Sequence, residues 1–198
     1  MRQAEVERLT RETKIRAKVN LDMPWSPDMA SGIDSGIGFF NHMLEQIGRH
    51  GNISIEISCE GDLDVDSHHT VEDCGIALGQ ALDKALGDKR GIRRYGTAYV
   101  PMDETLARVA LDLSGRPYCY FSAVFRAERV GAFETETVEE FFRALAVGAR
   151  MTWHGEILHG ENTHHQIEAL FKACGRALRE AVSPDPGVTD IPSSKGSL

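Results

Sequence analysis

The sequence has no surplus of positive charge and no long hydrophobic run, and these two absences exclude whole classes of function. Asp and Glu together number 30 against 22 for Lys and Arg, so the formal net charge is −8. Non-specific binding to nucleic acid requires a basic surface that displaces counterions, and we therefore expect no nucleic-acid partner. No segment approaches the roughly 18 apolar residues that a membrane helix requires, so we expect no membrane partner either.

Cysteine is also scarce, and its four occurrences show no CxxC spacing. Each lies within an apolar pattern, which is typical of small buried residues in a reducing compartment and not of a disulfide framework. The segment from Met1 to Lys14 is charged and contains no apolar core of a secretory signal. We therefore predict a cytoplasmic protein.

The motif HHxxE, by contrast, occurs twice, at residues 68–72 and 164–168. These two copies hold four of the eight histidines. The match continues without a gap on the C-terminal side of each copy: Ala77, Gly79, Ala81, Leu82 and Ala85 recur as Ala173, Gly175, Ala177, Leu178 and Ala181. This repeat predicts a duplicated supersecondary unit, with a helix that begins at each HHxxE.

Histidine and glutamate at this spacing indicate a metal site. Imidazole nitrogen and carboxylate oxygen are common ligands of transition metals. On a helix, His68 and His69 both share a face with Glu72, being four and three residues before it. The adjacent histidines nevertheless diverge by about 100°, so one motif can serve two ions. Two motifs therefore predict a dinuclear site, and a nitrogen and oxygen donor set without thiolate suits manganese or iron better than zinc.

Two further histidines are candidate ligands that would complete the coordination shells. His42 lies in a predicted helix and His154 in a short predicted strand that precedes the second motif. Taken alone, each is more often a half-buried structural histidine than a metal ligand. We interpret His50, at a helix end, and His159, before a glycine turn, as structural.

Hydrophobic periodicity predicts an α/β (α+β) fold. Alternation indicates strands at 13–21, 53–57, 97–101, 106–113, 118–125 and 153–158, and helical spacing indicates further helices at 39–49 and 136–150. Residues 23–38 hold two prolines and three glycines and are predicted to form a loop. We expect two half-domains, 1–95 and 96–183, each a β-sheet packed on a helix pair, followed by an extended tail at 184–198 that contributes to the site.

Five segments together resemble the signatures of the imidazoleglycerol-phosphate dehydratase family. They are GIGFFNHML at 36–44, DSHHTVED at 66–73, GENTHHQIE at 160–168, FKA at 171–173 and PSSKG at 192–196. The resemblance implies a carbon–oxygen lyase of histidine biosynthesis. Such an enzyme removes water from D-erythro-imidazole glycerol phosphate, by way of a di-manganese-bound imidazolate, to give imidazole acetol phosphate.

The resemblance also implies a role for each matching residue. Two Mn²⁺ ions per active site would be held by His42, His68, His69, Glu72, His154, His164, His165 and Glu168. Glu12, Glu72 and Glu168 would be catalytic. The small phosphorylated imidazole substrate would be contacted by Glu12, Arg94, Arg116, Lys172, Ser194 and Lys195. Guanidinium groups suit the phosphate because they bind its oxygens bidentately.

Family members assemble as shells of 24 chains in which the ligands of one site come from more than one subunit, so the resemblance implies a homo-oligomer. Two features depart from the family pattern. Asn41 stands where the family usually has Asp, which changes the partner expected for His42. The loop from Met23 to Ser35 is longer than usual.

Two other classes of function also use histidine and glutamate for metal. A dinuclear oxidase of the helical-bundle type carries Glu-x-x-His motifs, with more glutamates than histidines, and the strand patterns here argue against such a bundle. A metal-storage protein has no need of arginines and a Ser-Ser-Lys-Gly tail for a phosphate. A basic cluster and a polar tail can also simply be solvated, so from composition alone the storage alternative stays open.

Overall fold

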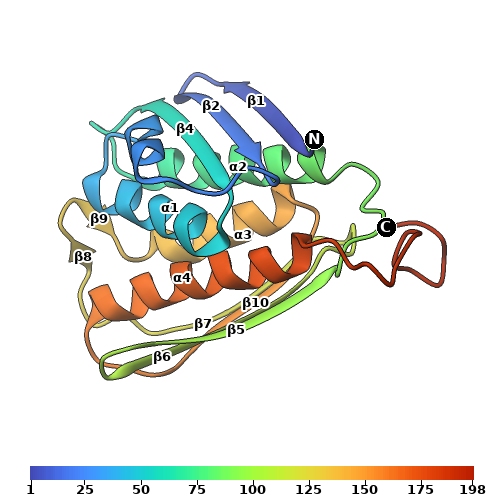
Figure 1. Ribbon diagram of the computed structural model, residues 1–198. Coiled ribbons are helices and arrows are strands. Elements are labelled where there is room, and N and C mark those ends of the chain that lie inside the picture. Colours follow the sequence, from blue (N-terminus) through green and yellow to red (C-terminus); the bar gives the residue numbers. More distant parts are fainter.

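The computed structural model describes residues 1–198 and confirms a duplicated α/β architecture (Figure 1). The first half contains β1 (Gln3–Leu9), β2 (Thr13–Asn20), a 3₁₀ helix η1 (Pro27–Gly32), β3 (Ile33–Asp34), α1 (Gly38–Gly51), β4 (Ser54–Gly61) and α2 (His68–Leu86). The second half contains β5 (Tyr95–Met102), β6 (Thr105–Asp112), β7 (Tyr118–Ser122), α3 (Thr137–Gly148), β10 (Thr152–His159) and α4 (Thr163–Val182). A small hairpin, β8 (Arg129–Val130) and β9 (Phe133–Glu134), lies between β7 and α3.

The two halves share one sheet topology. Their strand orders are β1-β2-β4-β3 and β5-β6-β10-β7. In each sheet the first three strands are antiparallel and the last runs parallel to its neighbour, β3 beside β4 and β7 beside β10. The sequence repeat is therefore a repeat of a whole sheet-and-helix unit.

The helices lie between the two sheets, which form the outer layers (Figure 1). α2 packs on β1 and β2, and α4 packs on β5 and β6; across the halves, α2 packs against α3 and α1 against α4. The matched glycines of the repeat lie at these helix crossings. A Cβ at Gly79 would be 2.6 Å from the Leu145 carbonyl oxygen, and one at Gly175 would be 2.7 Å from that of Ile47. Only glycine permits this approach, which explains its recurrence.

One hydrophobic core runs through both halves. It joins 48 buried residues, among them the fully buried Phe40 of the first half and Phe141, Phe142 and Trp153 of the second. Phe40 packs edge-on against Phe141 at 5.4 Å between ring centroids. The two topological repeats therefore fold around a shared interior, and the division into half-domains at 1–95 and 96–183 stays a prediction.

The structure differs from the sequence-based expectation in several segments. The strand predicted at 118–125 ends at Ser122, and the β8–β9 hairpin was not predicted. Strand β1 is missed by hydrophobic alternation because only Val6 is buried, while Glu5 on the outer face pairs with Arg16 of β2 at 2.7 Å. The loop predicted at 23–38 includes η1 and the two-residue strand β3, so that prediction was wrong in part. Beyond residue 183 the chain contains neither helix nor strand. No helix combines the length and apolar character needed to cross a membrane.

Candidate metal and active site

Both HHxxE motifs lie at the N-termini of long helices, as the repeat predicts. α2 begins at His68, whose N–H donates to Asp66 Oδ1 at 2.8 Å. Near the start of α4, the N–H of His165 donates to the side chain of the N-cap residue Asn162 at 3.2 Å. Asx side chains satisfy the free amides of a first helical turn and so determine where each motif helix starts.

Two other predicted ligands lie beside Glu168 of the second motif. Its Oε2 lies 2.9 Å from His164 Nε2 and 3.7 Å from Nε2 of His42, which comes from α1. Its Oε1 accepts from Lys172 Nζ at 2.6 Å, so this predicted substrate contact lies beside the predicted ligands. Burial of Glu168 would raise its pKa, but its hydrogen bonds with Lys172 and His164 outweigh burial and lower the pKa. The carboxylate is therefore ionised, the state in which it binds a metal.

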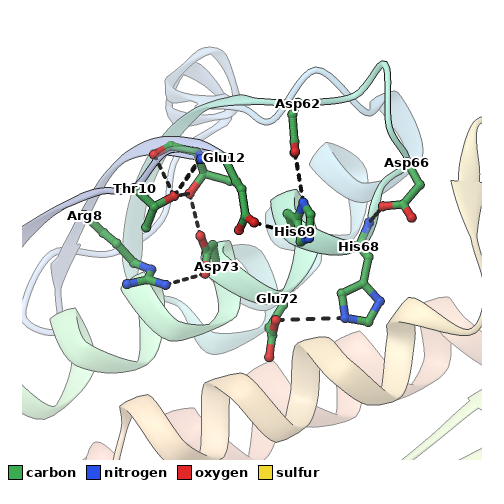
Figure 2. Close-up of polar contacts among 10 residues, drawn as sticks. Arg8, Thr10, Glu12, Asp62, Asp66, His68, His69, Glu72 and Asp73 are labelled. Atoms are coloured by element: carbon green, nitrogen blue, oxygen red, sulfur yellow. Dashed lines mark hydrogen bonds and ion pairs between the residues drawn. The ribbon is translucent and has the colours of Figure 1, made fainter.

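The first motif presents its two histidines in different directions (Figure 2). His68 Nε2 lies 3.9 Å from Glu72 Oε2. His69 lies between two carboxylates: its Nδ1 donates to Asp62 at 3.0 Å, and its Nε2 is 3.8 Å from Oε1 of Glu12. The hydrogen bond to Asp62 raises the pKa of His69. The divergence predicted for adjacent helical histidines is visible in Figure 2, where His69 points toward Asp62 and His68 toward Glu72.

His165 repeats the arrangement of His69. Its Nδ1 donates to Glu104 Oε2 at 2.8 Å, and its Nε2 lies 3.8 Å from Asp103 Oδ2. In both motifs a carboxylate therefore holds Nδ1 of the second histidine and directs Nε2 outward, as is typical of metal-binding imidazoles. These nitrogen and carboxylate-oxygen donors fit the manganese ions that the family resemblance implies.

His154 lies apart from the other predicted ligands. It is exposed on the outer face of β10, beside the rings of Tyr118 and Tyr120, at 5.8 and 5.4 Å between centroids. Its neighbour Trp153 is fully buried and faces the helices. Because the sheet separates His154 from α4, the predicted ligand set is not assembled within one chain. Nowhere in the chain do three or more His, Cys, Asp or Glu side chains form a group that could hold a metal ion.

The predicted phosphate-binding arginines meet at Asp112. Arg94 donates to it bidentately, at 2.7 and 3.1 Å, and the nearest nitrogen of Arg116 is 4.0 Å away. Arg94 also donates to the Pro192 carbonyl oxygen at 2.7 Å, which draws the tail to this site. Arg94 itself has a positive φ of 70°, a strained conformation that is common at functional sites.

The tail residues lie on the surface at the same end of the molecule. Ser194 and Lys195 are exposed, and the Lys195 N–H donates to Ser193 Oγ at 3.2 Å. A Cβ at Gly115 would be 2.6 Å from the Leu198 carbonyl carbon, so the tail reaches the turn that carries Arg116. Of the predicted substrate contacts, the structure thus brings together Arg94, Arg116 and the tail.

Comparison with known proteins decides the family. The family model described as imidazoleglycerol-phosphate dehydratase matches residues 35–178. The imidazoleglycerol-phosphate dehydratase of Streptococcus mutans is 58% identical over 198 residues, with all of both chains covered. The chain belongs to the imidazoleglycerol-phosphate dehydratase family. It is thus a hydro-lyase of histidine biosynthesis, as the sequence motifs predict.

Solved structures of the imidazoleglycerol-phosphate dehydratase family share this fold. The crystal structure from Staphylococcus aureus superposes with a TM-score of 0.81 at 43% identity and covers 92% of this chain and 99% of its own. The Pyrococcus furiosus structure, described as a complex with (S)-C348, gives a TM-score of 0.82 at 33% identity and covers 98% of this chain and 100% of its own. The predicted fold class is therefore confirmed.

Sequence reasoning missed three acidic residues at the imidazoleglycerol-phosphate dehydratase motifs: Asp62, Asp103 and Glu104. The last two lie in the β5–β6 turn, and the β1–β2 turn carries Glu12 at the corresponding place. In the repeat, each hairpin turn thus supplies an acid to the second histidine of its motif. Comparing the two turns in the sequence was the available signal, but their lengths and residues differ.

Asn41, where the imidazoleglycerol-phosphate dehydratase family usually has Asp, does not bond to His42. Its Oδ1 accepts from the N–H of Ser35 at 2.8 Å and from the Ser35 hydroxyl. The side chain that lies nearest to the ring nitrogens of His42 is Gln46, one turn later, at 3.4 Å from Nδ1. The side chain of residue 41 is therefore not the partner of His42 in this structure, and Asn41 instead holds the turn before α1.

Proposed function

We propose that this chain dehydrates D-erythro-imidazole glycerol phosphate to imidazole acetol phosphate with two Mn²⁺ ions per active site. The observation that carries the proposal is that the second histidine of each HHxxE motif has the same surroundings. His69 and His165 each have Nδ1 fixed by a carboxylate and Nε2 directed outward beside a second acid. Matched donor groups on two helices favour a dinuclear centre. Manganese, when bound, would supply Lewis acidity that favours the deprotonated substrate imidazole.

The acids beside Nε2 are our candidates for proton transfer. Elimination of water requires a group that takes a proton from carbon and a group that protonates the departing hydroxyl. The Glu12 side chain is 53% exposed and the Asp103 side chain is 81% exposed, so both are open to a substrate. Glu72 and Glu168 are instead placed to bind metal, each on the same helix as its histidines.

The phosphate end of the substrate would be held by Arg94, Arg116 and the tail residues Ser194 and Lys195. Arg94 and Arg116 already converge, and the tail lies beside them. Lys172 would act near the metal end, because it bonds to Glu168. The phosphate, which anchors the substrate, is thereby held apart from the metal end, where the reaction takes place.

We further propose that each complete site is shared between copies of the chain in the 24-chain assembly of the family. His154 is exposed on the outer face of its sheet, away from α4, and is open to contact with a neighbouring subunit. The same face displays the exposed rings of Tyr95, Tyr99, Tyr118 and Tyr120, whereas the outer face of the other sheet displays paired charges such as Arg16 with Glu5. Exposed aromatic side chains favour an interface. Cytoplasmic localisation stays a prediction.

An anaerobic assay tests the proposed function against both alternatives. Purified protein is treated with EDTA, reloaded with Mn²⁺ and supplied with imidazole glycerol phosphate in oxygen-free buffer, and imidazole acetol phosphate is measured by mass spectrometry. We expect turnover after reloading and none with EDTA present. A dinuclear oxidase would require oxygen, and a storage protein would bind manganese without forming product. Either result would overturn the proposal.

A further inference from the structure

Asp73, the residue after the first HHxxE motif, is a buried carboxylate that faces the β1–β2 hairpin. Only 7% of its side chain is exposed. Its Oδ1 accepts from Arg8 Nη2 at 2.7 Å, and its Oδ2 accepts from the Thr13 hydroxyl at 2.5 Å (Figure 2). Asp73 thus joins the helix that carries His69 and Glu72 to both strands of the hairpin whose turn carries Glu12.

The turn that carries Glu12 is internally ordered and is joined to its surroundings at two points beyond the pairing of β2 with β4. Within the turn, the Thr10 hydroxyl oxygen accepts from the N–H groups of Glu12 and Thr13 at 3.1 and 2.9 Å. One attachment is the hydrogen bond from Thr13 to Asp73. A second runs from the Asp62 N–H to the Glu12 carbonyl oxygen at 3.1 Å. Glu12 is therefore held between these two attachments.

The second half shows that the fold does not require a carboxylate at this helix position. At the matching place in α4 stands Ala169, which is fully buried. There the hairpin turn is fastened by its own Glu104, which accepts from the N–H groups of Glu161 and Asn162 at 3.1 and 2.8 Å and from His165. The two hairpin turns are thus held by different carboxylates. In both halves, however, an acid of the turn lies 3.8 Å from Nε2 of the second histidine of the motif, His69 or His165.

We propose that Asp73 is a positioning residue that acts through Thr13 to hold Glu12 beside Nε2 of His69. This inference rests on the proposed function, in which Glu12 transfers a proton. Burial of a carboxylate is costly unless it is paired, and an apolar residue such as Ala169 would pack without that cost. The charge of Asp73 is explained by the precision with which Glu12 must be placed to transfer a proton. A displacement of about 1 Å can lower the rate by a factor of about a hundred.

The kinetic test uses Thr13→Val, Thr13→Ser and Asp73→Asn, with Lys14→Ala as the matched control on the same hairpin. Lys14 pairs with Glu60 at the surface, where both side chains are at least 70% exposed. For Thr13→Val and Asp73→Asn we expect kcat to fall roughly ten- to a hundredfold while KM for imidazole glycerol phosphate and Mn²⁺ content stay near wild type. Thr13→Ser keeps the donor and should restore kcat, and Lys14→Ala should be neutral. A loss shared equally by Thr13→Ser, or one confined to KM, would overturn the proposal.

A second measurement separates positioning from general stability and from the chemistry. In a Glu12→Asp background, the shorter side chain no longer brings its carboxylate to the position that Glu12 occupies. Asp73→Asn should then cause little further loss of kcat. Fully additive losses would contradict action through Glu12. Amide hydrogen exchange on the EDTA-treated protein should become faster at residues 10–13 in Asp73→Asn and Thr13→Val but not in β4. This readout needs no turnover, so it stands even if the wild-type chain fails as a dehydratase; unchanged exchange would refute the fastening role.

Discussion

Glu168 Oε2 and His164 Nε2 lie 2.9 Å apart, and the other carboxylate oxygen of Glu168 is bonded to Lys172. The carboxylate is kept ionised by these partners although it is largely buried. A ligand that is charged and oriented before metal arrives has little reorganisation to undergo on binding. This arrangement distinguishes Glu168 from Glu72, whose side chain is 43% exposed and 3.9 Å from its histidine.

The two glutamates therefore make a first prediction about metal content. Glu168→Gln and Glu72→Gln should each lower Mn²⁺ content and abolish turnover, because an amide oxygen is a weaker ligand than a carboxylate. Elemental analysis measures the loss. Glu45→Gln is a suitable control, since Glu45 lies on α1 near His42 and was not predicted as a ligand. Variants that keep both activity and manganese would contradict the dinuclear site.

The second prediction concerns the residues proposed to bind the substrate phosphate. Arg116→Ala should reduce kcat/KM by about one to two orders of magnitude, because hydrogen bonds to a charged partner contribute about 1.5–3 kcal/mol each. Metal content should not change. Arg90→Ala is the matched control, an exposed arginine that pairs with Asp88. Steady-state kinetics decide the point, and equal effects of the two substitutions would remove Arg116 from the site.

The tail makes a third prediction. Deletion of residues 193–198 should lower kcat/KM much as Arg116→Ala does, because the proposed phosphate contacts Ser194 and Lys195 are lost. The Pro192 carbonyl that bonds to Arg94 is retained in this truncated chain. Kinetics of the truncated protein that match those of the full chain would show that the tail lies outside the site.

The position of His154 makes a fourth prediction, about sharing between subunits. His154→Asn and Glu168→Gln should each inactivate the protein alone. Mixed assemblies, reconstituted from dissociated chains, should regain about a quarter of wild-type activity, because some sites then combine an intact His154 with an intact Glu168 from different chains. No recovery in assemblies shown by light scattering to be mixed would mean that both residues serve the same chain's site.

Glu104 makes a fifth prediction, about pH. Hydrogen bonds from the Asn162 N–H, then from His165 and the Glu161 N–H, hold the pKa of Glu104 well below its usual range. A lowered folded-state pKa adds stability that is present above the unfolded value, about 4.3, and is lost as the pH falls through the folded value. In EDTA-treated protein, the excess stability of wild type over Glu104→Gln should therefore shrink below about pH 4. Urea unfolding at several pH values measures it, and a constant difference would contradict this role.

The sequence by itself determined the duplication, the motif helices and the family. HHxxE, its matched glycines and the alternation of apolar residues are local patterns, and local patterns specify where helices and most strands form. His42, His164 and Glu168 could be proposed together as ligands because the segments that resemble the family signatures contain them. Strand β1 was not predicted from the sequence, because an edge strand with one charged face shows little hydrophobic alternation.

Only the tertiary structure decided which partners surround those predicted ligands. Asp62 and Glu104 reach His69 and His165 from different elements, one before its motif and the other in a distant hairpin turn, so no common spacing predicts both. His154 is separated from the other predicted ligands because it lies on the outer side of β10. Which side is the outer one depends on which face of the sheet the helices cover. Such relationships arise from strand pairing and packing between residues far apart in the chain, where sequence spacing carries no information about distance.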